Sequence, residues 1–375
     1  DGRACMPPGV DANELSIRWT ARLTAPVTGN YHVTLSTGMG VAVYVDGLCV
    51  VDAWDWHEGA AQGHIPLIAG RVYAVRVEYR NLDGNANVRA VFSHETPEAD
   101  GIAEAVAVAR ASDAAVLVVG DGPDLNGEMH DRADLNLTGR QDALVRAVLD
   151  TGVPTVVVLI NARPLTINDL AAHAPAIVEA WNPGEEGGNA VADVLFGDYN
   201  PGGKLPLTFP RSVGQLPAYY NQEPGWHGGS YACGTSIAPL FPFGFGLSYT
   251  TFAYERLRLS QSVLREGETL QVAVDVTNTG ARKGDEVAQL YIRDVVASRV
   301  RPVKELKGFV RVALEPGETR GITFVLRWDD LAFYNGAMRK VVEPGEFEVM
   351  IGGNSVDLLR TPFEVVCDEA CPLDL

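Results

Sequence analysis

The sequence contains little cysteine, with five residues in a chain of 375. Small domains that cannot build a sufficient core rely on a much denser set of disulfides, so a disulfide scaffold is excluded. Cys367 and Cys371 form a C-x-x-x-C pair, but no further Cys or His lies beside them in the sequence. Because structural zinc sites use four such ligands, we predict no metal at this pair.

Long apolar runs and an excess of positive charge are also missing. No stretch approaches the ~18 apolar residues that a membrane-spanning helix needs. Lys and Arg together number 30, whereas Asp and Glu number 48, which gives a formal charge of −18. Such an acidic chain repels phosphate backbones and anionic lipid surfaces, so we expect neither nucleic acid nor a membrane as its partner. The composition does not decide whether the chain forms a homo-oligomer.

The first ten residues, DGRACMPPGV, lack the basic start and the apolar centre of a signal peptide. They do not begin with Met, so we expect the true start of the gene product to lie upstream. These residues favour neither a cytoplasmic nor a secreted location.

Residues 1–95 alternate apolar and polar side chains with a period of two, which is typical of half-buried strands. The clearest runs are LSIRWTA from Leu15, VAVYV from Val41 and RVYAVRVEY from Arg71. The dipeptide Asp46-Gly47 follows one of these runs and is a hairpin turn signal. The segment is therefore predicted to be a β-sandwich or part of one.

Residues 96–210 alternate between strand and helix patterns. Continuous apolar runs, typical of strands covered on both faces, are Ala114–Val119, Thr155–Ile160 and Ile177–Trp181. Helical patterns are Asp100–Ser112, the residues after a capping box at Thr138–Gln141, and Glu186–Phe196 before Gly197. The alternation predicts an α/β layer with a mostly parallel sheet. The sequence Asn161-Ala-Arg-Pro, after the second strand, is interpreted as a packing turn.

Residues 211–250 are rich in Gly, Pro and aromatic residues and are predicted to form an ordered connection. From Phe252 short alternating runs return, separated by turns, as far as residue 370. This pattern predicts a second β-sandwich, of immunoglobulin or fibronectin type, over residues 251–370. The whole chain is therefore expected to combine all-β and α/β domains.

Three sequence blocks closely resemble glycoside hydrolase family three. They are residues 181–206, WNPGEEGGNAVADVLFGDYNPGGKLP; residues 241–252, FPFGFGLSYTTF; and residues 278–309, with Asn278-Thr-Gly, GDEVAQLY and RPVKELKGF. The resemblance implies an α/β-sandwich domain followed by a fibronectin type III-like domain. Residues 1–95, with Val43-Tyr-Val-Asp-Gly, resemble the protective-antigen-type β-sandwich that some family-three β-glucosidases insert into the α/β domain.

The resemblance also implies that part of the enzyme lies outside this chain. The family begins with a (β/α)8 barrel that carries an aspartate nucleophile, and no such barrel is expected here. Asp55-Trp56 matches the nucleophile motif only superficially, because it lies within the first β-sandwich segment. We therefore expect the C-terminal portion of a longer enzyme, with the barrel in cis or as a separate chain.

Glu128 is the predicted general acid/base. Retaining hydrolysis needs a nucleophile and an acid/base, and the acid must keep its proton near neutral pH. The family places its acid/base in a Glu-Gly-x-Asp-Arg motif after a buried strand, and here the sequence is Glu128-Met-His-Asp-Arg132. The alternatives are that Glu128 is a solvated loop residue, or that Asp121 or Asp124 is the acid.

Four further residues are candidates for substrate binding. Asp131 and Arg132 either bind sugar hydroxyls or form an ion pair that fixes their loop. Trp54 and Trp56 either stack on sugar rings near the aglycone or pack within the first sandwich. Trp226, His227 and Tyr231 in the connection carry the same two interpretations.

The function predicted from the resemblance is hydrolysis of terminal β-D-glucosyl residues with retention, without a cofactor. A β-xylosidase of the same family is the nearest alternative. An inactive carbohydrate-binding or scaffolding fragment is the alternative from another class. The presence or absence of a nucleophile-bearing barrel discriminates between an enzyme and such a fragment.

Overall fold

The computed structural model describes residues 15–37, 39–55, 59–81, 88–94, 98–122, 125–225, 231, 234, 236–367 and 371–372. Its contacts divide the chain into two compact units, Asp1–Glu104 and Ala105–Leu375, which are described separately. The division falls inside helix α1 (Glu98–Arg110). The domain boundary at residue 95 stays a prediction.

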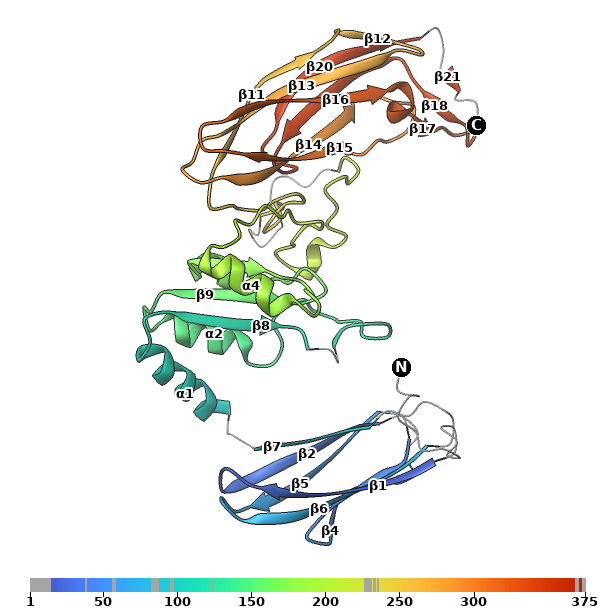
Figure 1. The fold of residues 1–375 in the computed structure, drawn as a ribbon. Coiled ribbons are helices and arrows are strands. Elements are labelled where there is room, and N and C mark those ends of the chain that lie inside the picture. The colour runs from blue at the N-terminus through green and yellow to red at the C-terminus, as the bar shows by residue number, and fades with distance from the viewer. Residues whose placement is uncertain are drawn as a thin grey trace, which may run out of the picture. The chain divides into compact units, whose positions relative to one another are not determined.

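The first unit consists of antiparallel strands in two sheets (Figure 1). The strands are β1 (Leu15–Thr24), β2 (Gly29–Thr37), β3 (Val41–Val45), β4 (Leu48–Ala53), β5 (Gly59–Leu67), β6 (Val72–Asn81) and β7 (Val88–His94). Their order is β1-β6-β3-β4 in one sheet and β5-β2-β7 in the other. Alternate side chains such as Val33, Leu35, Val41 and Val43 are fully buried in one core, which confirms an all-β fold for this segment.

The predicted hairpin joins β3 to β4. Asp46 and Gly47 have φ angles of 47° and 83°, the left-handed conformations that a tight hairpin turn requires and that Asp-Gly adopts readily. Asp46 also accepts hydrogen bonds from the Ala74 N–H (2.8 Å) and the Arg71 guanidinium (2.9 Å) on or beside β6. The turn is thereby tied to the neighbouring strand.

The second unit begins with a three-stranded parallel sheet in the order β10-β9-β8. Its strands are β8 (Ala115–Gly120), β9 (Thr155–Ile160) and β10 (Ala176–Glu179), and its helices are α2 (Gln141–Leu149), α3 (Asn168–His173) and α4 (Gly187–Phe196). The strand–helix alternation predicted from the sequence is confirmed. Gly197 ends α4 in a left-handed conformation, as its position after the helical pattern predicts.

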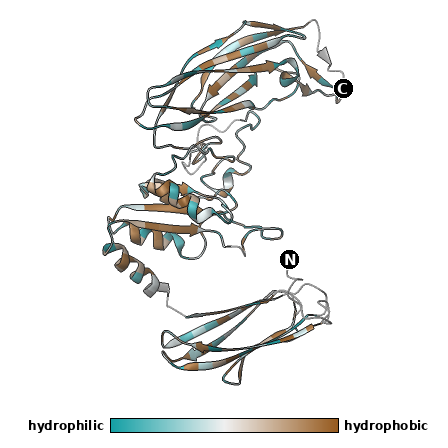
Figure 2. Ribbon diagram, viewed as in Figure 1, coloured by the Kyte–Doolittle hydropathy of each residue, from teal (hydrophilic) through white to brown (hydrophobic). Residues whose placement is uncertain are grey.

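One face of β8 is less covered than the sequence predicts. Val119 belongs to the core cluster that also holds Val145 of α2. On the opposite face, Val116 and Val118 are 52% and 60% exposed, although the strand is apolar along its length (Figure 2). The reason is that β8 is the edge strand of this sheet in the described part of the chain, and α2 packs against only one of its faces.

The predicted capping box at the start of α2 is wrong. The helix begins at Gln141, its N-cap residue is Arg140, and no side chain caps it. The Gln141 amide donates to the Thr138 hydroxyl (2.9 Å) and also bonds both backbone groups of Gly120, accepting from its N–H (2.6 Å) and donating to its carbonyl (2.8 Å). This pair of bonds fixes the last residue of β8, just before the loop that the sequence marks as functional.

A second β-sandwich ends the unit, as predicted. Its strands are β11 (Phe252–Leu259), β12 (Val263–Arg265), β13 (Thr269–Asn278), β14 (Gly284–Asp294), β15 (Glu305–Leu314), β16 (Thr319–Arg327), β17 (Phe333–Tyr334), β18 (Lys340–Val342), β19 (Gly345–Gly352), β20 (Leu359–Val366) and β21 (Cys371–Pro372). The main sheets have the orders β11-β13-β16 and β12-β20-β19-β14-β15, and a small third sheet has the order β17-β18-β21. Two 3₁₀ turns, Val213–Gln215 and Trp328–Leu331, also occur among the described residues.

The segment just before the predicted connection is joined to this sandwich by a buried ion pair. The Lys204 ammonium lies 3.0 Å from a carboxylate oxygen of Glu286 on β14, and Glu286 also accepts a hydrogen bond from the Tyr254 hydroxyl (2.8 Å). The Glu286 side chain is only 4% exposed. Close by, Gln289 donates to the carbonyl of Gly244, where a Cβ would collide with the Gln289 side chain. These contacts tie Lys204 and Gly244 to β14, and the bounds of the connection at residues 211–250 stay a prediction.

Removing one partner of the buried pair should destabilise this unit strongly. We expect Lys204→Met to cost about 3–5 kcal/mol, because it leaves the Glu286 carboxylate buried without its counter-ion. Lys283→Met is the matched control, since it removes the same charge from the exposed Lys283–Glu315 pair and should change stability little. Urea unfolding of both variants measures the difference, and equal midpoints would contradict the role of the pair.

Candidate active site

The carboxyl end of β8 leads into a loop over residues 121–137 that contains several predicted site residues. In parallel sheets the loops beyond the carboxyl ends of strands are where ligands bind. Asp121 opens the loop, and its N–H donates to the carbonyl of Ile160, the last residue of β9 (2.9 Å). The loops after β8 and β9 therefore start side by side.

Asp121 carries a buried carboxylate held by two guanidinium groups. Its side chain is fully buried. Arg132 donates to Oδ1 at 2.7 Å, and the Nε of Arg163 lies 3.5 Å from Oδ2. A buried charge needs such pairing, because desolvation is otherwise too costly. A fully buried, paired carboxylate cannot reach a substrate, so Asp121 is no longer a candidate for the acid.

Arg132 holds the second half of the loop. Besides Asp121, it donates to the Asp134 carboxylate (3.2 Å) and to the carbonyl of Asn136 (2.5 Å). The interpretation that Arg132 pairs with Asp131 is wrong for the described residues, because its partners are Asp121 and Asp134. Adjacency in the sequence suggests Asp131 as the partner of Arg132, whereas the fold brings the Arg132 guanidinium to Asp121, just after the end of β8.

Arg163 holds the first half of the loop. It follows β9 and donates to the carbonyls of Leu125 (2.5 Å) and His130 (3.2 Å). These two carbonyls bracket Glu128 in the sequence. The segment interpreted as a packing turn is therefore also the support of the predicted acid/base loop.

Glu128 lies exposed at the turn that these contacts support. Next to it, Met129 has φ = 63°, in the left-handed region that favours glycine. The family motif identified from the sequence has glycine at this position, and Met129 here has a conformation that glycine adopts more readily. Asp131 is exposed beside it. Asp124 lies outside the described residues.

Trp54 lies in the first unit, just after β4. The guanidinium of Arg80 stands 5.1 Å from the centre of its ring, and Arg80 also pairs with Asp55 at 3.0 Å. Part of the indole is thus used for packing within the sandwich. Trp56, Trp226 and His227 lie outside the described residues.

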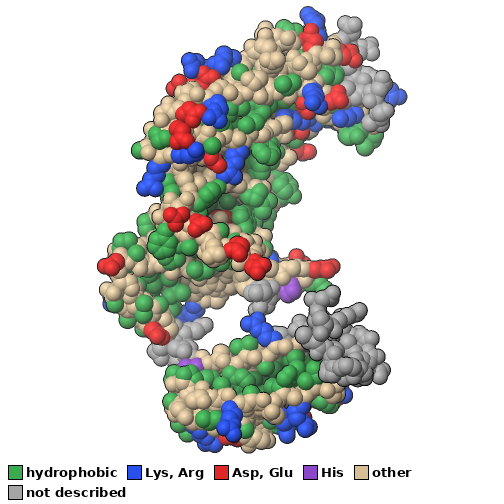
Figure 3. Space-filling model, viewed as in Figure 1, with side chains coloured by type: hydrophobic (Ala, Val, Ile, Leu, Met, Phe, Trp, Pro, Cys, Tyr) green, Lys and Arg blue, Asp and Glu red, His purple; other side chains and the backbone are tan. Residues whose placement is uncertain are grey.

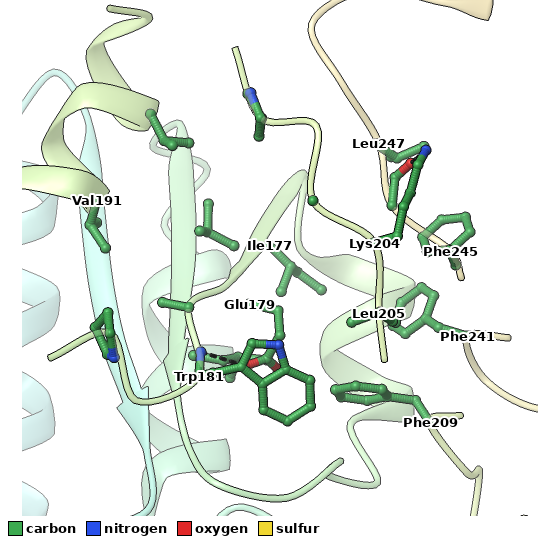
Figure 4. Close-up of a pocket in the computed structure, with 18 of the residues that line it drawn as sticks. Ile177, Glu179, Trp181, Val191, Lys204, Leu205, Phe209, Phe241, Phe245 and Leu247 are labelled. Atoms are coloured by element: carbon green, nitrogen blue, oxygen red, sulfur yellow. Dashed lines mark hydrogen bonds between the residues drawn. The ribbon is translucent and has the colours of Figure 1, made fainter. Parts of the chain in front are cut away.

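A cavity of about 420 Å³ lies in the second unit between β10, α4 and the connection. Figure 4 shows Trp181, Phe209 and Phe241 along one side of it, with the carboxyl of Glu179 beneath the indole of Trp181. The Glu179 carboxyl accepts a hydrogen bond from the backbone N–H of Trp181 (3.0 Å) and a longer one from the side-chain amide of Asn161 (3.5 Å). Most other lining residues are apolar.

Burial in this apolar cavity raises the pKa of Glu179 to about 7, and its two hydrogen bonds oppose the shift only partly. Asn161 also donates to the carbonyl of Arg163 (2.8 Å). The buried Asn161 side chain thus joins the Glu179 carboxyl of the cavity to Arg163, which supports the predicted acid/base loop.

The surface charge, the metal-ligating side chains and the helices of the described residues bear on other possible partners. The visible charged side chains of the α/β portion are mainly acidic, in line with the net charge (Figure 3). Among the described residues, no group of three or more His, Cys, Asp or Glu side chains could hold a metal ion. No described helix has the length and apolar character needed to cross a membrane.

Sequence reasoning missed Arg163 and Glu179. One signal was present for Arg163, which lies just after the predicted strand Thr155–Ile160, at the edge where loops converge. Glu179 lies inside the predicted strand Ile177–Trp181, and the structure makes it the last residue of β10. The contacts themselves join residues more than 30 positions apart for Arg163, and periodicity does not reveal them.

Comparisons with known proteins match most of the chain. The family described as "Glycosyl hydrolase family 3 C-terminal domain" matches residues 18–249, and "Fibronectin type III-like domain" matches residues 286–355. A "Beta-xylosidase" of Formosa agariphila is 50% identical over 70% of this chain and 37% of its own length. A "Beta-glucosidase" of Rhizobium radiobacter is 38% identical over 94% of this chain and 47% of its own.

A solved structure covers nearly the whole chain. The β-glucosidase of Kluyveromyces marxianus, determined in complex with glucose, has a TM-score of 0.83 and 30% identity over 98% of this chain and 47% of its own. The present chain thus spans less than half the length of these relatives.

The raised pKa of Glu179 predicts a pH dependence of stability. The folded state keeps a proton up to about pH 7, whereas the unfolded carboxyl loses it near 4.5. Stability from this group is therefore lost as the pH rises between these values, by up to about 3 kcal/mol. Glu179→Gln should remove this loss and unfold later than wild type at pH 8, with a smaller difference at pH 5. Glu185→Gln, an exposed neighbour, is the control in the same denaturant titrations, and identical pH profiles for both variants would contradict the assignment.

Proposed function

Because this chain belongs to glycoside hydrolase family 3, we propose that it is the C-terminal portion of a retaining β-glucosidase and that Glu128 is the general acid/base. The proton of the Glu128 carboxyl passes to the glycosidic oxygen as the bond to the anomeric carbon breaks. The resulting carboxylate then takes a proton from the water that attacks the glycosyl-enzyme.

The observation that carries this proposal is the construction of the loop around Glu128. An exposed carboxyl stands on a left-handed turn, and the turn is held at the carboxyl edge of a parallel sheet by a buried ion cluster. Solvated loop glutamates need no such support. A positioned carboxyl that projects outward suits a group that meets a substrate held by another surface.

That other surface is proposed to be the family's nucleophile-bearing (β/α)8 barrel, in cis or as a separate chain. Retention requires a carboxylate about 5–5.5 Å from the acid/base. A barrel that covers Glu128 would also exclude water from the carboxyl, as the acid role requires.

The sugar is proposed to be β-D-glucose. The β-glucosidase of K. marxianus covers nearly all of this chain. The sequence pattern of residues 1–95, including Val43-Tyr-Val-Asp-Gly, adds a resemblance to the insert of some family-three β-glucosidases. β-D-Xylose is the second candidate, because the relative with 50% identity is a β-xylosidase. An inactive carbohydrate-binding fragment is disfavoured, because it would not need the backbone contacts that hold the loop of Glu128.

The residues proposed to bind the substrate are Asp131 and Arg132 of the second unit and Trp54 and Trp56 of the first. Asp131 is the best placed in the described loop, since it is exposed next to the turn. Arg132 contributes through the loop, because its guanidinium is engaged by Asp121 and Asp134. The two tryptophans are proposed to stack on the aglycone.

Loss of the Glu128 carboxyl should affect substrates according to their leaving groups. In the full-length enzyme, Glu128→Ala should slow hydrolysis of alkyl glucosides by about 10²–10⁴-fold. Dinitrophenyl glucosides, which need little protonation, should still glycosylate the enzyme, and azide should then speed turnover by releasing a β-glycosyl azide. Asp131→Ala is the control and should show no azide effect. An equal loss on both substrates without azide rescue would exclude Glu128 as the acid/base.

Residues 1–375 alone should not hydrolyse aryl β-glucosides. Without the nucleophile of the barrel no glycosyl-enzyme forms. Activity should appear when a separately produced barrel is added, and adding the barrel to Glu128→Ala chain gives the control. Turnover by the purified chain without a partner would overturn the assignment of the nucleophile.

A further inference from the structure

One guanidinium group touches both ends of the turn that carries Glu128. The Nη2 of Arg163 donates to the Leu125 carbonyl at 2.5 Å, and its Nη1 donates to the His130 carbonyl at 3.2 Å. Guanidinium is planar, so its two terminal nitrogens have a fixed separation. The distance between the two backbone carbonyls is therefore set by a rigid group.

Arg163 is itself held on three sides. Pro164 follows it and restricts its backbone to an extended conformation. The fully buried Asn161 donates to its carbonyl at 2.8 Å. The Nε of Arg163 faces the buried Asp121 carboxylate at 3.5 Å. The end of β9 thus presents this guanidinium to the loop after β8 in one orientation.

We propose that Arg163 is the positioning residue of the acid/base. By fixing the carbonyls of Leu125 and His130, it determines where the Glu128 carboxyl meets the glycosidic oxygen. Its guanidinium does not touch the substrate. This inference rests on the proposed function of Glu128, because positioning matters only if that carboxyl transfers the proton.

A lysine in this place would keep the charge but lose the support. Its ammonium is a compact point charge on a flexible stem and lacks the fixed fork that spans two carbonyls. It would still neutralise Asp121, so Arg163→Lys separates positioning from the burial of an unpaired charge. Arg163→Met removes both and serves as the second variant, with thermal melting used to record the folded fraction.

The experiment compares alkyl and dinitrophenyl β-glucosides in the full-length enzyme. Because displacement by about 1 Å can cost 10²-fold, Arg163→Lys should lower kcat/KM for the alkyl glucoside by about 10–100-fold and much less for the dinitrophenyl glucoside. Arg211→Lys is the matched control. Arg211 also donates to a backbone carbonyl, that of Ala238, but it lies in the connection and should affect both substrates equally.

A double-mutant cycle decides whether Arg163 acts through Glu128. In the Glu128→Ala enzyme, Arg163→Lys should cause no further loss on the alkyl glucoside. A loss that persists there, or one that is equal for both leaving groups, would overturn the inference and leave Arg163 a structural residue. Failure of the proposed function would differ, because Glu128→Ala itself would then show no dependence on the leaving group.

Discussion

The buried carboxylate of Asp121 is the constraint on which the candidate site depends. A carboxylate without solvent access must be neutralised, and here two guanidiniums from different loops do so, at 2.7 Å from Arg132 and 3.5 Å from Arg163. Because each arginine also bonds backbone carbonyls of the loop after β8, neutralising the charge fixes the course of that loop. The need to neutralise the buried Asp121 carboxylate thus determines the geometry of the loop after β8.

This arrangement explains why Glu128 can be both exposed and ordered. Exposed side chains on long loops usually gain no fixed position, because few contacts offset their entropy. Here the support comes from the backbone on either side and not from contacts of the carboxyl, and Glu128 itself lies exposed. The same logic applies to the Gly- and Pro-rich segment around Lys204, which the Lys204–Glu286 pair holds against the second sandwich. In both places a buried carboxylate on or next to a strand pairs with a cation, and the pair fixes a segment that has no regular secondary structure.

The sequence predicted the elements well and their side-chain partners poorly. Thr155–Ile160 was predicted with its observed bounds, and Asp46-Gly47 and Gly197 were identified as a turn and a helix end, because periodicity and local backbone preference decide such features. Gln141 fitted a capping box by spacing, yet its amide bonds Gly120, 21 residues away. The partners of Asp121 are set by which strands lie adjacent in the sheet, and no local pattern records that. The family motif singled out Glu128 as the predicted acid/base, but it did not indicate which residues support its loop.

Met129 links the strain of the loop to its support. A residue with a Cβ in the left-handed region costs roughly 1–2 kcal/mol, and such a conformation persists only where the surroundings impose it. The surroundings do so here, because Arg163 bonds the carbonyl of Leu125 before the turn and that of His130 directly after Met129. Loosening that support would let Met129 relax to a negative φ, and the turn would rotate Glu128 away from its present direction. The strain is therefore held in place by the same guanidinium that we propose to aim the carboxyl.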